Sequence, residues 1–177
     1  YDDYFGGTPY WDEVRFRAIP EASTRVAELL TGNVDIIVNV PTNEWDRINT
    51  EENTEMVLGN GTRIYNVIMK WNTSPTQNKQ VREAVAYAID AQTIIDTVLK
   101  GAGTPCYTRI APGVFGQDKS LYNINKYDPD KAKELIASSG YNGEEIELLV
   151  PSGRYLMDSE VGKVVAAMLQ EAGLNIK

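Results

Sequence analysis

The feature that most restricts the fold is a strongly helical segment in the middle of the chain, from about Lys79 to Leu99. Its apolar residues recur at spacings of three and four, which places them on one buried helix face. These residues are Val81, Ala84, Val85, Ala88, Ile89, Ile94, Ile95, Val98 and Leu99. Asn78 is suited to cap the start, Asp90 to cap a second, continuing helix, and Gly101 to end it. We therefore expect other elements to complete a core around this face.

The rest of the chain alternates between helical and strand-like patterns. Helices are predicted over about residues 21–30, 44–48, 129–139 and 159–172, and strands over about residues 14–18, 34–40, 64–71, 146–150 and 174–176. Asp128 and Pro129 have the residue types of an N-cap and a first helical position. Asp158 or Ser159 is expected to cap the last helix. The first two strands and the helix between them would form a βαβ unit with parallel pairing.

A long loop separates the central helical segment from the next helix. Residues 101–127 are rich in glycine, proline and aromatic residues. A loop of this length inside a compact domain is uncommon and is often functional. Cys106 lies within it, and we expect this residue to be a small, partly buried filler.

The composition excludes several classes of function. The chain has 25 acidic and 17 basic residues and a net charge of -8, so nucleic acid, which is also negatively charged, is not an expected partner. It has no histidine, the commonest general base and metal ligand. Its single cysteine allows neither an internal disulfide nor a thiolate zinc cluster. We therefore expect no catalytic residue, no metal site and no cofactor.

Five segments, in order, resemble a known family of receptors. The most specific is Val81–Asp90, with the sequence VREAVAYAID, which continues to Gly101, Ala102 and Pro105. The other segments lie in residues 4–20, 22–36, 127–141 and 153–176. Together they are similar to the extracellular solute-binding proteins of family 5, the peptide-, nickel- and oligosaccharide-binding receptors of ABC importers.

The resemblance implies an α/β fold of the periplasmic-binding-protein type II class, in which two lobes close around a ligand. Family members are considerably longer than this chain. Residues 1–62 are therefore expected to form a βαβ portion of the first lobe, and residues 63–177 the first part of the second lobe. The segments that return to complete both lobes are expected to lie outside this sequence.

The resemblance also implies a function. The parent protein would be a receptor and not an enzyme. It would capture a small extracellular solute, expected to be a di- or oligopeptide, and deliver it to an ABC permease. The expected location is extracytoplasmic, in the periplasm or as a cell-surface lipoprotein. Residues 1–20 lack the pattern of a signal peptide, and no apolar run approaches the roughly 20 residues of a membrane span. The signal sequence is expected elsewhere, and the chain by itself is expected to self-associate.

The strongest candidate ligand contacts are Arg154, Tyr155 and Asp158, in a loop between a predicted strand and the last helix. Such loops project side chains at the sheet edge where open α/β folds bind ligands. Arginine can bind a carboxylate, aspartate can pair with an amine, and tyrosine offers a flat wall with a polar tip. Trp71 and Asn72 are weaker candidates. Structural roles, as surface loop, helix cap or packing residues, stay open for all five.

Two alternatives remain open. The same receptor fold could take an oligosaccharide, an opine or a metal carried by a chelator. A protein of another class, a hydrolase, would need two carboxylates at catalytic separation. The acidic pairs Glu51-Glu52 and Glu144-Glu145 lie in predicted turns, which favours a solvated role.

Arg82 lies near the start of the central helical segment, where the helix dipole disfavours a positive charge. We therefore expect a specific carboxylate partner for its guanidinium group.

Overall fold

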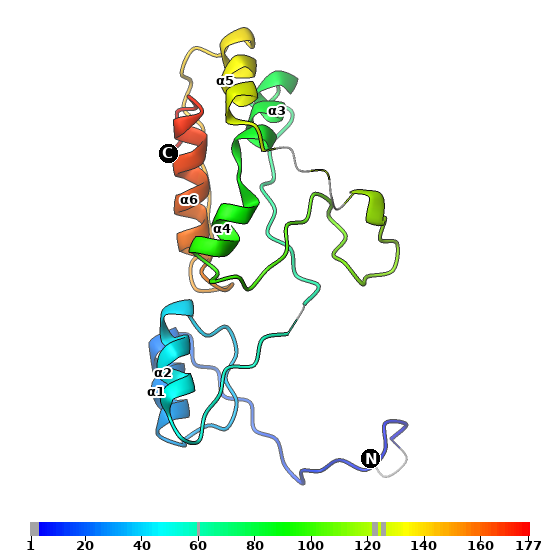
Figure 1. Cartoon of the computed structure of the whole chain (residues 1–177), viewed down its shortest axis with the longest axis vertical. Coiled ribbons are helices and arrows are strands. Elements are labelled where there is room, and N and C mark those ends of the chain that lie inside the picture. Colours follow the sequence, from blue (N-terminus) through cyan, green and yellow to red (C-terminus); the bar gives the residue numbers. More distant parts are fainter. Residues whose placement is uncertain (1–3, 60, 122–123, 125–126) are drawn as a thin grey trace.

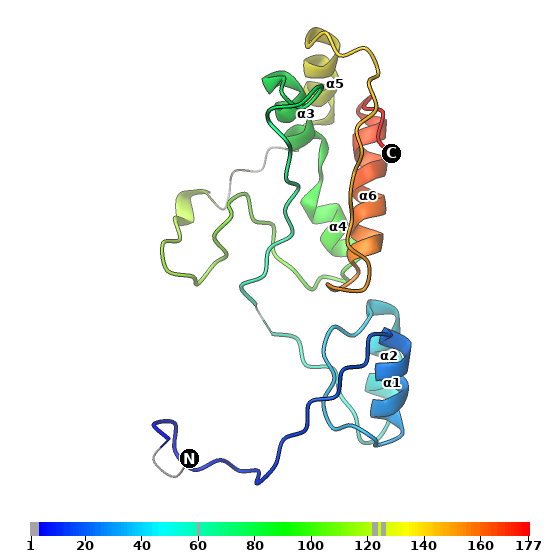
Figure 2. The same ribbon diagram turned by 180° about the vertical axis from the view of Figure 1, so that it is seen from behind.

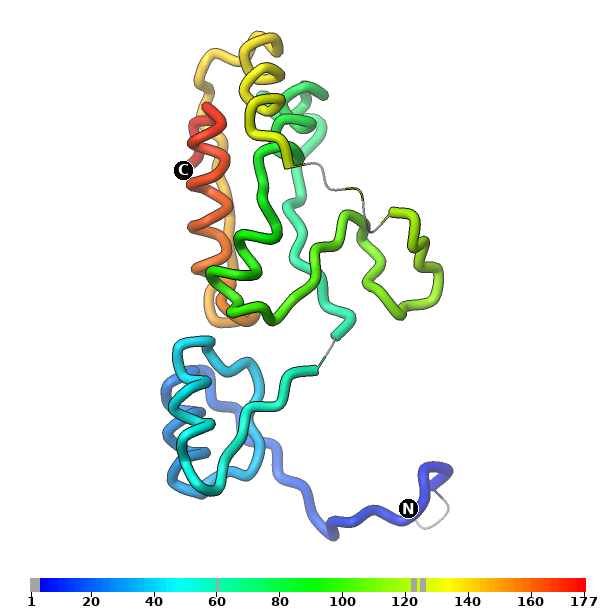
Figure 3. Tube along the Cα trace, in the orientation of Figure 1, coloured from blue at the N-terminus to red at the C-terminus, as the bar shows by residue number. Residues whose placement is uncertain are grey.

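The structure is a computed structural model that describes residues 4–59, 61–121, 124 and 127–177. Its helices are α1 (Ala22–Leu30), η1 (Thr42–Glu44), α2 (Trp45–Thr50), α3 (Lys79–Ala88), α4 (Ala91–Thr97), η2 (Lys119–Leu121), α5 (Pro129–Ser138) and α6 (Asp158–Glu171). Figures 1 and 2 show α1 and α2 side by side in one part of the molecule and α3 to α6 in another. Extended segments connect the two parts, as the tube in Figure 3 shows.

The smaller core lies around α1 and α2. Its buried side chains are Val26, Val40, Trp45 and Ile48. The indole N–H of Trp45 donates to the backbone carbonyl of Val40 at 3.0 Å. The one polar group of this buried side chain is therefore hydrogen-bonded. Helix α1 ends as predicted, because Gly32 takes a left-handed conformation with φ of 72° just beyond the C-cap Thr31.

The larger core is formed by α3, α4, α5 and α6. Its buried residues are Val81, Ala84, Val85, Ala88, Ile94, Ile95, Leu99, Ala132, Ile136, Val161, Val165, Leu169, Ala172, Leu174 and Ile176. The predicted buried face of the central segment is thus confirmed for most positions, whereas Ile89 and Val98 are only partly buried. The segment is two helices, as predicted, since Asp90 accepts hydrogen bonds from the backbone N–H groups of Gln92 and Thr93.

The caps of α3 and α5 also fasten these helices together. The Asn78 side-chain oxygen accepts from the N–H of Gln80, and its amide nitrogen donates to the carbonyl of Ser139 at 2.8 Å. The Asp128 carboxylate accepts from the N–H of Lys131, while its own N–H donates to Tyr87 at 2.9 Å. Both predicted N-caps are confirmed, and each also ties one helix to its neighbour.

The predicted cap of α6 is wrong. Met157 is the N-cap, in a left-handed conformation with φ of 53°, and Asp158 is the first residue of the helix. The Asp158 side chain accepts hydrogen bonds both from the N–H of Gly153 in the preceding loop and from the N–H of Ser159 in the helix.

The predicted strands are not formed in the described part of the chain, apart from one parallel bridge between Ile146 and Ile176. The expected βαβ unit is therefore not formed within the described residues, where Phe16 is 96% and Ile36 is 78% exposed. The physical reason is that a strand needs a partner backbone. Around the bridge such a partner exists, because the N–H of Ile146 donates to Asn175 at 2.8 Å. That residues 1–62 belong to the first lobe stays a prediction.

The two cores contact each other through a few specific interactions. The Thr42 hydroxyl donates to the carbonyl of Val98 at 3.1 Å, and Lys100 forms an ion pair with Asp46 at 3.1 Å. The side chain of Leu156 packs against both cores. Two cores joined in this way are consistent with the expected division at residues 62 and 63, which stays a prediction.

Candidate functional site

The loop before α6 is organised by one buried carboxylate. Asp158, 5% exposed, accepts hydrogen bonds from the backbone N–H groups of Gly153, Arg154, Tyr155 and Ser159, all at 2.9 to 3.0 Å. Three of these donors belong to the loop and one to the first turn of the helix. The carboxylate therefore fixes the direction in which the loop enters α6.

The hydrogen bonds also set the charge of Asp158. Burial raises the pKa of its carboxyl, but the four backbone N–H donors together outweigh burial, so the pKa lies below its ordinary value. An ionised carboxylate offers about four acceptor positions, which these donors fill. We accordingly assign to Asp158 the positioning of the loop, and its contact with a ligand amine stays a prediction.

Tyr155 is the centre of a cluster that joins this loop to the extended segment after residue 60. Its half-buried ring has the guanidinium carbon of Arg154 at 5.2 Å and that of Arg63 at 5.1 Å from the ring centroid. The ring of Tyr65 meets it edge-on, with 6.4 Å between centroids. We call Arg63, Tyr65, Arg154 and Tyr155 the arginine–tyrosine cluster. It combines two exposed cations with aromatic surface, which suits an anionic or amphipathic ligand.

Tyr65 anchors the extended segment to the loop. Its hydroxyl donates to the backbone carbonyl of Leu156. Burial raises the pKa of the Tyr65 phenol, the charge of Asp158 raises it further, and Arg63 opposes the shift. The phenol is therefore held as a donor at neutral pH. Because Leu156 packs against both cores, the cluster lies where the two cores meet.

Sequence reasoning found Arg154 and Tyr155 but missed Arg63 and Tyr65. The hydrogen bond from Tyr65 to Leu156 spans 91 residues of sequence. The alternation of residues 64–71 predicts an extended segment but carries no sign of what that segment contacts. No signal in this one sequence could have paired the two regions.

Trp71 and Asn72 lie apart from the arginine–tyrosine cluster. Trp71 lies six positions after Tyr65 in the sequence, and an extended chain over that interval spans up to about 20 Å. Figure 3 shows this stretch running away from the loop before α6 toward α3. Both side chains are exposed, with Trp71 at 74%. The structure therefore does not bring all five candidate residues into one site.

The turn that carries Trp71 is held by hydrogen bonds to backbone carbonyls. The buried Thr76 hydroxyl donates to the carbonyls of Lys70 and Thr73. The Arg82 guanidinium group donates to the carbonyls of Thr76 and Gln77, each at 2.8 Å. The carboxylate partner expected for Arg82 is wrong, because carbonyl oxygens that precede α3 satisfy the guanidinium group.

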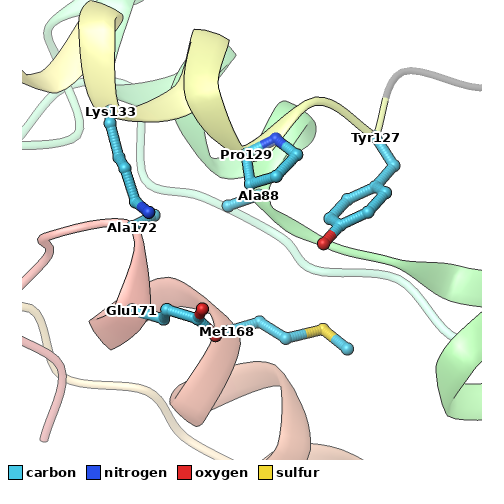
Figure 4. A pocket seen from close by; sticks show the side chains of 7 residues that line it. All are labelled: Ala88, Tyr127, Pro129, Lys133, Met168, Glu171 and Ala172. Carbon is cyan, nitrogen blue, oxygen red and sulfur yellow. The ribbon is translucent and has the colours of Figure 1, made fainter.

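Two cavities of the described structure are lined by residues other than the candidate residues. A cavity of about 20 Å³ lies between α3, α5 and α6 and is lined by Ala88, Tyr127, Pro129, Lys133, Met168, Glu171 and Ala172 (Figure 4). It has room for water only. An open groove of about 240 Å³ runs beside α6 and is lined by Leu148, Val150, Ser159, Gly162, Lys163, Ala166 and Lys177. Neither cavity includes a residue of the arginine–tyrosine cluster.

Two further features, a cluster of metal-ligating side chains and a helix that could cross a membrane, are absent from the described part of the chain. Residues 4–59, 61–121, 124 and 127–177 contain no group of three or more metal-ligating side chains. The same ranges contain no helix with the length and apolarity to cross a membrane. Cys106 is partly buried and free, and its sulfur contacts the carbonyl of Thr108 at 3.2 Å.

Comparison with known families gives a match along the whole chain. Residues 1–177 match the family described as bacterial extracellular solute-binding proteins, family 5 Middle. The chain belongs to this family. Members of family 5 are receptors that bind solutes, in agreement with the resemblance seen in the sequence.

Two relatives show the range within family 5. Heme-binding protein A of Haemophilus influenzae is 28% identical over 151 residues, which cover 85% of this chain and 27% of that protein. Oligopeptide-binding protein AppA of Bacillus subtilis is 28% identical over 193 residues, which cover 99% of this chain and 35% of that protein. The chain thus spans between a quarter and about a third of the length of these relatives.

A solved family 5 structure confirms the fold class. The periplasmic binding protein DppA from Helicobacter pylori, in complex with peptide STSA, has a TM-score of 0.79 and 25% sequence identity. The match covers 100% of this chain and 34% of DppA. The chain therefore has, in part, the type II periplasmic-binding-protein fold, although its extended segments are largely unpaired.

Proposed function

We propose that the protein carrying this chain is the solute-binding component of an ABC importer and that its solute is a di- or oligopeptide. The observation that supports this most is the family match over all 177 residues. The similarity to an oligopeptide-binding protein and to DppA with its bound peptide supports the choice of ligand. In this proposal the protein works outside the cytoplasm and hands the solute to a membrane permease.

The mechanism we propose is closure of two lobes around the solute. Residues 1–62 would belong to the first lobe and residues 63–177 to the second. Ligand sites of two-lobe proteins occur preferentially at domain interfaces. The arginine–tyrosine cluster lies where the two cores meet, so Arg154 and Tyr155 are proposed as ligand contacts. Trp71 and Asn72 lie at the far end of the extended segment that begins near Tyr65, so they would contact only a ligand long enough to reach that end.

The surroundings of the paired acidic residues favour a receptor over a hydrolase. The Glu144 carboxylate accepts from the N–H of Asn142 in an exposed turn, and Glu145 forms an ion pair with Lys177 at 3.5 Å. Glu51 and Glu52 are both exposed. None of these carboxylates lines either cavity described above. We therefore propose a receptor in which no bond is made or broken.

The test uses the full-length protein that carries this chain. Native mass spectrometry would identify the solute that co-purifies with it, and calorimetry with a mixed library of di- to pentapeptides would measure affinity. We expect peptide to be retained, and Arg154→Gln to weaken binding while Arg47→Gln, a change of equal charge on the exposed face of α2, does not. Retention of a non-peptide solute, with no heat of binding from any peptide, would contradict the proposal.

A further inference from the structure

Two positive charges converge on one aromatic ring at the junction of the cores. The guanidinium groups of Arg63 and Arg154 each lie little more than 5 Å from the centroid of Tyr155. They are therefore at most about 10 Å apart, a separation comparable to the Debye length of about 8 Å in physiological salt, so their repulsion is only partly screened. An anion that lies near both charges offsets the repulsion.

No carboxylate of the described chain compensates these two charges. Among residues 4–59, 61–121, 124 and 127–177, Arg63 and Arg154 form no ion pair and donate no side-chain hydrogen bond, although the same region contains seven ion pairs. The acidic residue that lies beneath the loop, Asp158, is buried and bonded to four backbone N–H groups. Glu160, in the first turn of α6, is exposed and pairs with neither arginine.

The contrast with other arginines of the chain is informative. Arg25 and Arg82 donate to backbone carbonyls, and Arg17 combines an ion pair with a carbonyl contact. These side chains have structural partners. Arg63 and Arg154 instead lie over the ring of Tyr155, and their guanidinium N–H groups donate to no described residue. A guanidinium group in this state can bind a carboxylate through two parallel hydrogen bonds.

We infer that Arg63 and Arg154 together make the site select anionic solutes. Such a solute carries a carboxylate in addition to the C-terminal carboxylate that every peptide has. The inference rests on the proposed function, because it specifies the class of solute that this receptor captures. Arg63 belongs to the extended segment and Arg154 to the loop before α6, so one anion held by both would connect the two. Tyr155 provides the apolar wall between them.

The test compares two peptides that differ only in charge, Ala-Glu-Ala and Ala-Gln-Ala, by calorimetry on the full-length protein. We expect the glutamate peptide to bind about 10- to 100-fold more tightly, the range for a charge-assisted hydrogen bond to a carboxylate. Arg63→Gln and Arg154→Gln should each remove most of this preference. Arg63→Lys, which keeps the charge but loses the planar fork, should retain part of it. Arg47→Gln is the matched control and should leave the preference intact.

Each outcome separates this inference from the proposed function. Equal affinity for both peptides would overturn anion selection and leave peptide capture standing. A preference for the glutamate peptide that survives both arginine-to-glutamine changes would also overturn it. If neither of these peptides nor any peptide of the mixed library binds, peptide capture fails, and glutarate, a dicarboxylate without a peptide bond, becomes the probe. Binding of glutarate that Arg63→Gln abolishes would then support anion selection, and absence of binding would overturn it.

Discussion

Replacing Asp158 with alanine tests the central structural claim about the site, namely that one buried carboxylate organises the loop before α6. The change removes the acceptor of four backbone hydrogen bonds. Hydrogen bonds to a charged group contribute about 1.5–3 kcal/mol each, but they are not additive. Gly153 and Arg154 are exposed, so their released N–H groups can bind water instead. We therefore expect a loss of about 2–4 kcal/mol in the free energy of unfolding, equivalent to one or two such bonds.

The measurement is urea unfolding followed by far-ultraviolet circular dichroism, with Glu160→Ala as the matched control. Glu160 lies in the same helical turn, but its side chain is exposed and forms no hydrogen bond or ion pair with a described residue. Its removal should cost only the interaction with the helix dipole, about 0.3–1 kcal/mol. An unchanged dependence on urea would show that the variants unfold to the same extent. If the two variants differ by less than about 0.5 kcal/mol, the carboxylate does not organise the loop.

The contribution of Asp158 to stability should depend on pH. The pKa of Asp158 lies below its ordinary value in the folded protein, so its contribution to stability is present above the unfolded pKa. The contribution is lost as the pH falls through the folded pKa, when the carboxylate is protonated. The difference in unfolding free energy between the wild type and Asp158→Ala should therefore be full at pH 7 and shrink below pH 3.8, the ordinary value. A difference that stays constant down to pH 2 would contradict this reasoning.

Three further predictions concern the fold. Asn78→Ala and Asp128→Ala should each lower the free energy of unfolding by about 0.5–2 kcal/mol, measured by urea unfolding, since each loses an N-cap. Val85→Asp should prevent stable folding, because Val85 is 5% exposed and an aspartate there would be buried without a partner; a normal melting curve would refute this. The exposed Phe16 and Ile36 predict that the 177-residue chain alone self-associates, and a monomer at high concentration in light scattering would show otherwise.

The helices were predictable from the sequence because their signals are local. An N-cap such as Asn78 and a stop such as Gly32 act within a few residues of themselves. The spacing of Val81 and Val85 identifies the buried face without knowledge of what covers it. The cap of α6 was misjudged because Asp158 satisfies N–H groups on both sides of itself, which a search for capping residues does not distinguish.

The strands were not predictable in the same way. Alternation in residues 34–40 describes a backbone suited to pairing, but a ladder forms only where a second backbone lies alongside. Ile146 and Ile176 have each other and form a bridge, whereas Ile36 and Val38 have no such partner in the described chain and stay exposed. Half of the arginine–tyrosine cluster was missed for a related reason, because Tyr65 meets its partner across 91 residues of sequence.

The arrangement separates the residues that build the site from those proposed to use it. Asp158 is buried and fixes the backbone of the loop, so its loss should affect both stability and the position of Arg154. Arg63 and Arg154 are exposed and lie over an aromatic ring, an interaction that contributes about 0.5–1 kcal/mol at such positions. Their loss should leave stability nearly unchanged while changing which solute is bound. A ligand preference can therefore vary at these two positions without disturbing the carboxylate that supports them.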